Sequence, residues 1–416
     1  MPRSRRIFPN CPTKTIFKHA AGWRDRVRPV YSECHFYSQL KDHSNLMTTR
    51  RDILKATSSF AILRVPHSIA SFAIEWGLPS APANPIPWPK PIGSPVLDNL
   101  RPVIEKSRDV RTHYAEIVEV AKWMAYEELP MPNIAVPFGL EKTPEIAIDY
   151  VMVTNCIDSA FTDFKTHVKF QVDYAGQHFS DADAMQACVK RAMDDGIPIL
   201  DGKFLSRVTK DELAKIFAGN IEMPMLDEKM AVFHEVGNLL SAKYGGRFLN
   251  FVRSCSQRLY DNGNGLIDRL VKEFPRYNDI SQYDGHEVKF YKLSQLGAWG
   301  LYSGLSGTGA FKLEDADKLT AFADYIVPVA LRVMGMTSYS PALEKTINSS
   351  EMIPRDSRQE IEIRAHCLYA TALLREEVNK LRPPDLQVII PQIDARLWTH
   401  YHVTTWPHHL TRTIMY

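Results

Sequence analysis

The chain has 416 residues, of which 45% are hydrophobic and 24% charged, a composition typical of a folded globular protein rather than a disordered one. Its formal net charge of +2 is too small to indicate a nucleic-acid partner by itself, and no apolar run reaches the roughly 18 residues that a membrane-spanning helix needs. The six cysteines are scattered without a C-x-x-C pair, which argues against a structural zinc site or a disulfide framework and for a reducing compartment.

The first 93 residues differ from the rest, and we expect them to form a basic, proline-rich extension. Lysines and arginines far outnumber acids in the first sixty positions. Such a leader is typical of a mitochondrial transit peptide, a solvated tail or translated sequence upstream of a later start such as Met47, and composition does not separate the three. Residues 79–91 carry prolines at nearly alternating positions, which predicts an extended linker. We expect a cytoplasmic protein, with mitochondrial import as the alternative.

Residues 94–416 are expected to form one domain whose first part is mostly helical. Apolar residues recur between Val96 and Tyr126 with a period near 3.6. The β-branched run 150–154 predicts either a strand or the start of a buried helix. Residues 167–179 alternate apolar and polar positions and then turn at Gly176, which predicts a small β-hairpin.

Helices are also predicted over most of the remaining chain. Gly196 ends a helix over 184–195, and Thr209 with Glu212 has the spacing of a capping box. In the helix predicted over 358–381, Arg358 can pair with Glu362 and Glu360 with Arg364, each four residues apart. The absence of alternating strands and helices argues against a parallel sheet, and we expect a mainly α fold. The further predicted helices are 228–243, 248–260, 265–274, 290–301, 319–334 and 386–398.

The most informative stretch is 318–328, which is apolar and predicts a helix or the entry to one. Leu319, Phe322, Val327, Leu331 and Val333 would supply its buried stripe, and Asp324 stands in the middle with aromatic neighbours. A carboxylate among aromatic side chains is costly unless it is hydrogen-bonded, paired or used. From the residues alone, Asp324 is either a helix cap or a partner of an arginine, or it is a catalytic carboxylate in an aromatic pocket.

Several common site motifs are absent from the sequence. It contains neither a P-loop nor a G-x-S-x-G elbow. Four histidines, His400, His402, His408 and His409, gather near the end, but their spacing suits surface histidines better than a metal site. We therefore expect neither a metal nor a cofactor.

Phrases spread over residues 94–416 together resemble one family, the queuosine salvage proteins, which are queuosine 5′-phosphate N-glycosidases. No single phrase is specific, but their order and spacing are. The phrases are RAMDDGIPI (191–199), FLN (248–250), FPRYND (274–279), VKFYK (288–292), FADY (322–325), RQEIEIR (358–364), DARLW (394–398) and the closing residues 407–416.

The resemblance implies a fold, a reaction and a set of site residues. The fold would be a single helical domain similar to helix-hairpin-helix DNA glycosylases, with a small β-hairpin. The reaction would be hydrolysis of queuosine 5′-phosphate to queuine, which is inserted into tRNA. The substrate would be a small nucleotide, with neither nucleic acid nor membrane as a direct partner. Asp324 would be catalytic, and the substrate-binding residues would be Phe322, Asp394, Trp398, Lys292, Asp158 and Phe161.

These residue types suit the chemistry. Cleavage of an N-glycosidic bond builds positive charge on the sugar, which a carboxylate such as Asp324 stabilises or attacks. Aromatic walls exclude water and stack on a flat base. A 7-deaza base has no N7 to protonate, so we expect Asp394 to assist its departure at the guanine-like edge. Lys292 is the first candidate for the 5′-phosphate, with Arg358 and Arg364 as weaker ones.

The sequence departs from the family pattern mainly around the expected pocket. Where members carry an Asn-Phe-x-Phe-Trp run, residues 158–162 read Asp-Ser-Ala-Phe-Thr and keep only Phe161. The changed positions are Asp158, Ser159, Thr162, Ala182, Asp183, Ile326 and Thr399. Because Asp324 is intact, we expect an active, divergent member. The alternatives are a hydrolase of another modified nucleotide and a non-catalytic nucleotide- or tRNA-binding relative.

Overall fold

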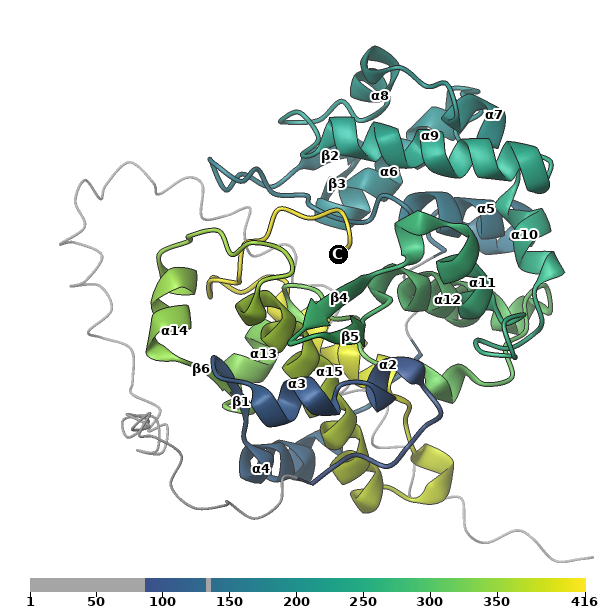
Figure 1. The fold of residues 1–416 in the computed structure, drawn as a ribbon. Helices are drawn as coiled ribbons and strands as arrows, with labels where there is room; N and C mark the ends of the chain where they lie inside the picture. The colour runs from purple at the N-terminus through teal and green to yellow at the C-terminus, as the bar shows by residue number, and fades with distance from the viewer. Residues whose placement is uncertain (1–86, 132–135) are drawn as a thin grey trace, which may run out of the picture. The chain divides into compact units, whose positions relative to one another are not determined.

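The computed structural model describes residues 87–131 and 136–416, which all belong to one compact unit, Trp76–Tyr416 (Figure 1). The predicted basic leader, Met47 and most of the predicted linker lie outside the described residues. The end of that linker, residues 87–91, contains neither helix nor strand. It packs against the domain, because Trp88 stacks on Tyr369 with ring centroids 5.1 Å apart.

The described residues form a mainly α fold, as predicted, with strands only in two-stranded antiparallel pairs. The pairs are β1 (Val110–Thr112) with β6 (Thr337–Tyr339), β2 (Gln171–Tyr174) with β3 (Gln177–Ser180), and β4 (Ile280–Tyr283) with β5 (His286–Lys289). The helices before β4 are α2 (Pro95–Asp98), α3 (Arg101–Lys106), α4 (Tyr114–Met124), α5 (Pro144–Asn155), α6 (Asp181–Asp194), α7 (Gly202–Leu205), α8 (Lys210–Ile216), α9 (Leu226–Lys243), α10 (Phe248–Ser254) and α11 (Leu266–Glu273). Those after β5 are α12 (Lys292–Leu305), α13 (Val327–Val333), α14 (Pro341–Asn348), α15 (Arg358–Leu381) and α16 (Ile390–Tyr401).

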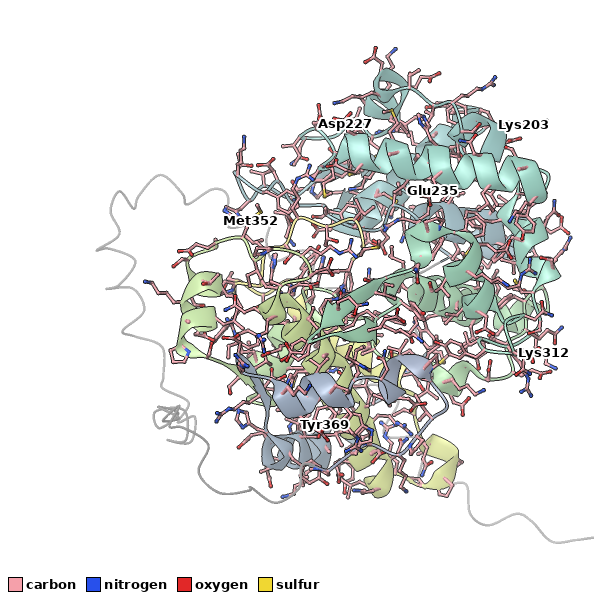
Figure 2. All side chains as sticks on the ribbon, viewed as in Figure 1. Lys203, Asp227, Glu235, Lys312, Met352 and Tyr369 are labelled. Atoms are coloured by element: carbon pink, nitrogen blue, oxygen red, sulfur yellow. The ribbon has the colours of Figure 1, made fainter. Side chains whose placement is uncertain are left out.

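The long helix α15 is the centre of packing for the elements around it. It contacts α3, α4, α13 and α16, and every residue from Glu360 to Leu374 is buried. Tyr369 accordingly lies among other side chains in the lower part of Figure 2, whereas Lys203 and Asp227, labelled in the upper part, are exposed. The bounds predicted for this helix, 358–381, are confirmed. The Ser357 side chain caps its start by accepting a hydrogen bond from the Glu360 N–H.

One of the two ion pairs predicted on α15 is confirmed and the other is wrong. Glu360 and Arg364 lie 3.5 Å apart. Arg358 instead pairs with Asp284 at 3.1 Å, on the β4–β5 turn. Glu362 points the other way, where its carboxylate accepts backbone N–H groups at the start of β1, including that of Val110 at 3.1 Å. Buried acceptors of this kind outweigh a surface pair between neighbours on a helix.

Several predicted helix limits are corrected by the structure. The stretch from Val96 to Tyr126 is divided into α2, α3, β1 and α4, and the predicted helix 319–334 begins only at Val327. The helix predicted over 248–260 ends at Ser254, and the one over 386–398 begins at Ile390. The 150–154 run lies within the buried helix α5, one of the two outcomes the sequence left open.

The hairpin predicted at Gly176 is confirmed as β2–β3, and its turn is Ala175-Gly176, both with positive φ. A second hairpin, β4–β5, was not predicted, although its Asp284-Gly285 turn has the same character. No helix among residues 87–131 and 136–416 combines the length and apolar character needed to cross a bilayer.

Candidate functional site

A cavity of about 340 Å³ brings together the catalytic and substrate-binding residues that the family resemblance implied. Its walls come from α5, the loop after α5, the start of α6, α12, residues 322–325 and α16. The lining residues run from Val151 on α5, in the upper part of the view in Figure 1, to Tyr416 at the end of the chain, so segments distant in the sequence meet here. The assigned residues that line it are Asp324, Phe322, Asp394, Trp398, Lys292, Asp158 and Phe161.

The segment 319–326, which carries Asp324, is buried without being helical. Side chains from neighbouring helices take up its backbone N–H groups. Gln295 on α12 accepts from the Thr320 N–H at 2.9 Å, and Asp394 on α16 accepts from the Phe322 N–H at 2.8 Å. These contacts satisfy backbone groups that a helix would otherwise bond internally. They explain why this apolar run, whose pattern predicts a helix, is not helical and instead forms part of the cavity wall.

Asp324 is both a helix cap and a cavity residue. Its side chain is buried, and its Oδ1 atom accepts from the N–H groups of Ile326 at 2.8 Å and Val327 at 3.0 Å, at the start of α13. Among the described residues, all hydrogen bonds to this carboxylate go to Oδ1, which leaves Oδ2 for a ligand. Burial raises the pKa of Asp324, while the positive charge of Lys292 and the two N–H donors oppose that rise. No arginine pairs with it in the described part of the chain.

Asp394 is a second buried carboxylate close to the first. Burial and the negative charge of Asp324 raise its pKa well above the ordinary value, against the single N–H donor from Phe322 and the charge of Lys292. Asp324 has two N–H donors and Asp394 has one, so their environments favour different protonation states. Pairs of this kind commonly divide the roles of charge stabilisation and proton or hydrogen-bond donation.

Lys292, the first residue of α12, is buried beside these carboxylates. Its Nζ atom lies 3.8 Å from Asp158 Oδ2 and its charge acts on Asp324 and Asp394. The two weaker phosphate candidates do not line the cavity. Arg364 is bound to Asp279 at 3.1 Å and lies between the rings of Phe290 and Tyr416, and Arg358 pairs with Asp284.

Aromatic rings supply the flat surfaces of the cavity. Trp398 is half-buried and stacks on His402, with ring centroids 4.3 Å apart and planes 20° apart. Phe322 and Phe161 are buried. Trp299 and Tyr325 also line the cavity, although the sequence did not assign them to substrate binding. Trp299 lies two helical turns after Lys292 on α12, so the two residues share one face of the helix. This spacing could have identified Trp299 from the sequence.

The loop between α5 and β2 is held by a buried lysine that the sequence analysis missed. Lys229 on α9 is only 1% exposed, and its ammonium donates to the carbonyls of Ser159 at 2.7 Å, Ala160 at 3.0 Å and Pro224 at 2.7 Å. It also lies over the Phe161 ring at 5.1 Å. Lys229 therefore sets the position of the loop that presents Asp158 and Phe161. Its place on the apolar face of α9, one turn before Val232 and Phe233, was the available signal.

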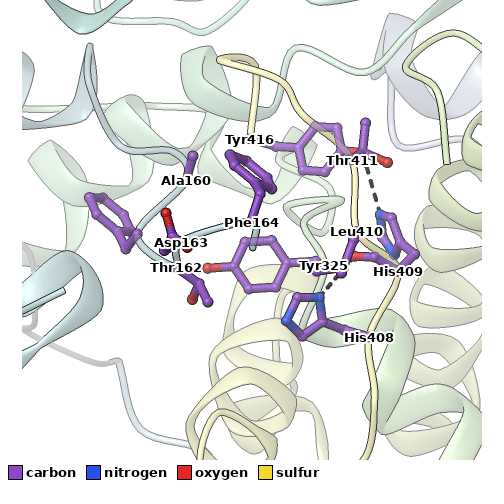
Figure 3. Close-up of a pocket in the computed structure, with 11 residues that line it drawn as sticks. Ala160, Thr162, Asp163, Phe164, Tyr325, His408, His409, Leu410, Thr411 and Tyr416 are labelled. Atoms are coloured by element: carbon purple, nitrogen blue, oxygen red, sulfur yellow. Dashed lines mark hydrogen bonds between the residues drawn. The ribbon is translucent and has the colours of Figure 1, made fainter. Parts of the chain in front are cut away.

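A smaller cavity of about 30 Å³ is lined by Tyr325 and by two of the clustered histidines, His408 and His409 (Figure 3). The expectation of surface histidines is wrong for His409, which is buried and whose pKa falls to about 3 because of that burial. His408 stacks on Tyr325 with ring centroids 4.6 Å apart. Within residues 87–131 and 136–416, no group of three or more His, Cys, Asp or Glu side chains could hold a metal ion.

Comparison with known proteins identifies the family. A family model described as "Queuosine salvage protein" matches residues 139–416. The chain belongs to the queuosine salvage protein family. It is 31% identical over 324 residues to a queuosine 5′-phosphate N-glycosylase/hydrolase of Sphaerobacter thermophilus, covering 77% of this chain and 97% of that protein. Proteins of the same name match from Bos taurus, with 31% identity (68% and 80% covered), and Mus musculus, with 29% (77% and 98%).

In this queuosine salvage protein, the sequence departures gather where a ligand would contact the wall. Asp158, Ser159, Ala182, Asp183 and Thr399 all line the larger cavity. Thr162 lines the smaller one. Ile326 is buried and contributes its backbone N–H to Asp324. The hydrogen bonds that hold Asp324 and Asp394 in place use backbone N–H groups, which do not depend on the changed side chains.

Proposed function

We propose that this protein hydrolyses the N-glycosidic bond of queuosine 5′-phosphate and releases queuine for tRNA modification. The observation that carries the proposal is the meeting of Asp324, Asp394 and Trp398 in one cavity, from a loop segment and a helix far apart in the sequence. A cavity of about 340 Å³ is within the size range of sites that bind small molecules. The names of the relatives support the same reaction.

In the proposed mechanism, Asp324 acts on the sugar. Its free Oδ2 atom faces the anomeric carbon and stabilises the positive charge that develops as the bond to the base breaks. A water molecule then supplies the hydroxyl group of ribose 5-phosphate, and the departing base takes up a proton. Because Oδ1 is held by Ile326 and Val327, the carboxylate is already oriented before the substrate binds.

Asp394 is proposed to contact the guanine-like edge of the base, and Trp398 and Phe322 to hold its faces. The raised pKa of Asp394 favours a form that can donate a hydrogen bond to the leaving base. Phe161 and Asp158 complete this wall. Stacking of an aromatic side chain on a base contributes about 1–3 kcal/mol per base, which is enough to fix the base beside the carboxylates.

Lys292 is proposed to bind the 5′-phosphate. It supplies the one lysine ammonium among the described residues that line the cavity. The Lys292 Nζ atom lies 3.8 Å from Asp158 Oδ2, too far for a hydrogen bond, so its N–H groups are able to donate to a phosphate.

Three broader predictions also belong to this proposal. The helical core is similar to helix-hairpin-helix DNA glycosylases, residues 94–416 form the catalytic domain, and the protein acts in the cytoplasm or, if the basic leader directs import, in mitochondria. The mainly α fold and the packing of residues 87–93 against α15 support a domain that begins near the end of the proline-rich stretch.

The test is incubation of the purified protein with synthetic queuosine 5′-phosphate, with queuine and ribose 5-phosphate measured separately. Equal amounts of the two products are expected from the wild type, and far less from Asp324→Asn. Equal product from both proteins would exclude Asp324 as the catalytic group. Binding of the nucleotide without product from either protein would favour a non-catalytic relative.

A second candidate substrate is another modified nucleotide. The observation in its favour is that Asp158 and Asp183 line the cavity at positions where the family resemblance implies an amide and an aromatic ring. A panel of 7-deazaguanine nucleotides, assayed for base release beside queuosine 5′-phosphate, distinguishes the two. The highest kcat/KM for queuosine 5′-phosphate supports the first candidate.

A further inference from the structure

The mouth of the larger cavity carries an acidic wall made of Asp158, Asp181 and Asp183. Asp158 belongs to the loop after α5, and the other two to the first turn of α6. Desolvation and the charges of Asp158 and Asp181 raise the pKa of Asp183, while His402 opposes the rise. These three carboxylates therefore lie close enough to repel one another, and no role in the proposed mechanism uses Asp181 or Asp183.

The cavity has more negative than positive groups. Among the described residues that line it are five aspartates, against one lysine, Lys292, and one histidine, His402. Asp181 Oδ2 is paired with Lys169 at 2.8 Å and His402 at 3.0 Å. The side chain of Asp183, in contrast, makes no hydrogen bond or ion pair with any residue that the structure describes, and Asp183 is exposed to solvent.

Asp181 provides an independent sign that a ligand completes this wall. Its side chain is only 5% exposed, and its Oδ1 atom is buried without a hydrogen-bond partner among the described residues. A buried carboxylate oxygen is costly when no donor satisfies it. Because Asp181 lines the cavity, a donor group on a bound ligand can supply the missing hydrogen bond.

We propose that Asp183 and Asp181 bind a protonated alkylamine carried by the base of the substrate, an inference that rests on the proposed function. The chain would thus select 5′-nucleotides whose base bears a cationic side arm over those whose base is neutral. Queuosine 5′-phosphate has such a group, a secondary ammonium on its 7-deazaguanine base. An ammonium can donate to Asp181 Oδ1 and offset the charge of Asp183, whereas these two carboxylates repel the phosphate and Lys292 attracts it.

The experiment compares two substrates and two variants. The substrates are queuosine 5′-phosphate and 7-deazaguanosine 5′-phosphate, which lacks the cationic arm. For the wild type, kcat/KM is expected to be higher for the cationic substrate. In Asp183→Asn the ratio of the two kcat/KM values is expected to fall about tenfold, the effect of losing one charge-assisted contact. Asp173→Asn is the matched control, because that aspartate lies on β2 with its side chain 85% exposed and outside the cavity.

Binding of the free bases distinguishes failure of this inference from failure of the proposed function. The ratio of Kd for queuine and 7-deazaguanine, measured by tryptophan fluorescence, requires no turnover. If the wild type releases no base but the ratio of Kd for queuine to Kd for 7-deazaguanine rises about tenfold in Asp183→Asn, the amine site is supported and the proposed reaction is contradicted. An unchanged ratio in Asp183→Asn, in binding or in turnover, would overturn the amine site whatever the activity.

Discussion

Asp394 accepts a hydrogen bond from the backbone N–H of Phe322 at 2.8 Å, and this bond ties α16 to the segment that carries Asp324. The contact fixes the distance between the two buried carboxylates, because Asp324 is only two residues from Phe322. It also places Trp398, one turn after Asp394 on α16, on the same cavity wall. One side chain thus has a structural role and a proposed role in the reaction.

The first prediction is that Asp394→Asn stabilises the protein and reduces its activity. Burial raises the pKa of Asp394 above the ordinary value of 3.8, so the folded state binds this proton more tightly than the unfolded chain does. The wild type therefore loses stability as the pH rises from about 4 through the raised pKa of the folded state. Asparagine keeps an oxygen for the Phe322 N–H and has no proton to lose.

Urea unfolding at several pH values checks this prediction. The variant is expected to gain about 0.5–2 kcal/mol at neutral pH, the usual size of a stability gain at a functional site. The gain should shrink towards pH 4, where the carboxyl group is protonated in both states. A variant less stable than the wild type at pH 7.5 would show that the Asp394 carboxylate is not strained by its environment.

The second prediction concerns Trp398, whose ring is proposed to stack on the base. Trp398→Ala should weaken binding of the nucleotide by about 1–3 kcal/mol, the range for an aromatic contact with a base. The measurement is the Kd of queuosine 5′-phosphate with the Asp324→Asn protein and with the double variant. Trp406→Ala is the control, because Trp406 is 51% exposed and does not line the cavity.

The third prediction is that Lys229→Met destabilises the fold and disturbs the cavity. The substitution leaves the carbonyls of Ser159, Ala160 and Pro224 without their shared donor. Unsatisfied buried groups cost about 1–3 kcal/mol each, so we expect a loss of at least about 2 kcal/mol in the free energy of unfolding. Because the loop carries Asp158 and Phe161, KM should rise as well.

Lys215→Met is the control for Lys229, since Lys215 is exposed on α8 and its side chain makes no hydrogen bond or ion pair with another described residue. Both variants are unfolded in urea and assayed at several substrate concentrations. A Lys229→Met protein with wild-type stability and KM would contradict the role given to the lysine in positioning the loop.

The sequence was sufficient for elements whose limits depend on neighbouring residues. The bounds of α15 follow from the Ser357 cap and Pro383, and those of the β2–β3 hairpin from its glycine turn. Segment 319–326 was predicted as helix because its apolar pattern is compatible with one. Its true form depends on Gln295 and Asp394, which are distant in the sequence and whose contacts no local pattern reveals.

The site residues were predictable for a different reason. Phe322, Asp394 and Trp398 were assigned through the family resemblance, and the structure brings them into one cavity. Lys229 was missed because a single lysine in an amphipathic helix is usually on the solvent side. Of the acidic wall, only Asp158 and Asp183 were visible, as departures from the family pattern, and their spacing in sequence does not indicate that they meet.

The central claim is that the Asp324 carboxylate, held by the first N–H groups of α13, stabilises the sugar as the base departs. The most direct measurement is the rate of queuine release from saturating queuosine 5′-phosphate by the wild type and by Asp324→Asn. Asparagine can still accept from Ile326 and Val327, so the thermal unfolding midpoint should stay within a few degrees. We predict a fall in kcat of about 10²–10³-fold, comparable to the loss of a key electrostatic group in other enzymes. A folded Asp324→Asn protein that releases queuine at the wild-type rate would contradict the claim.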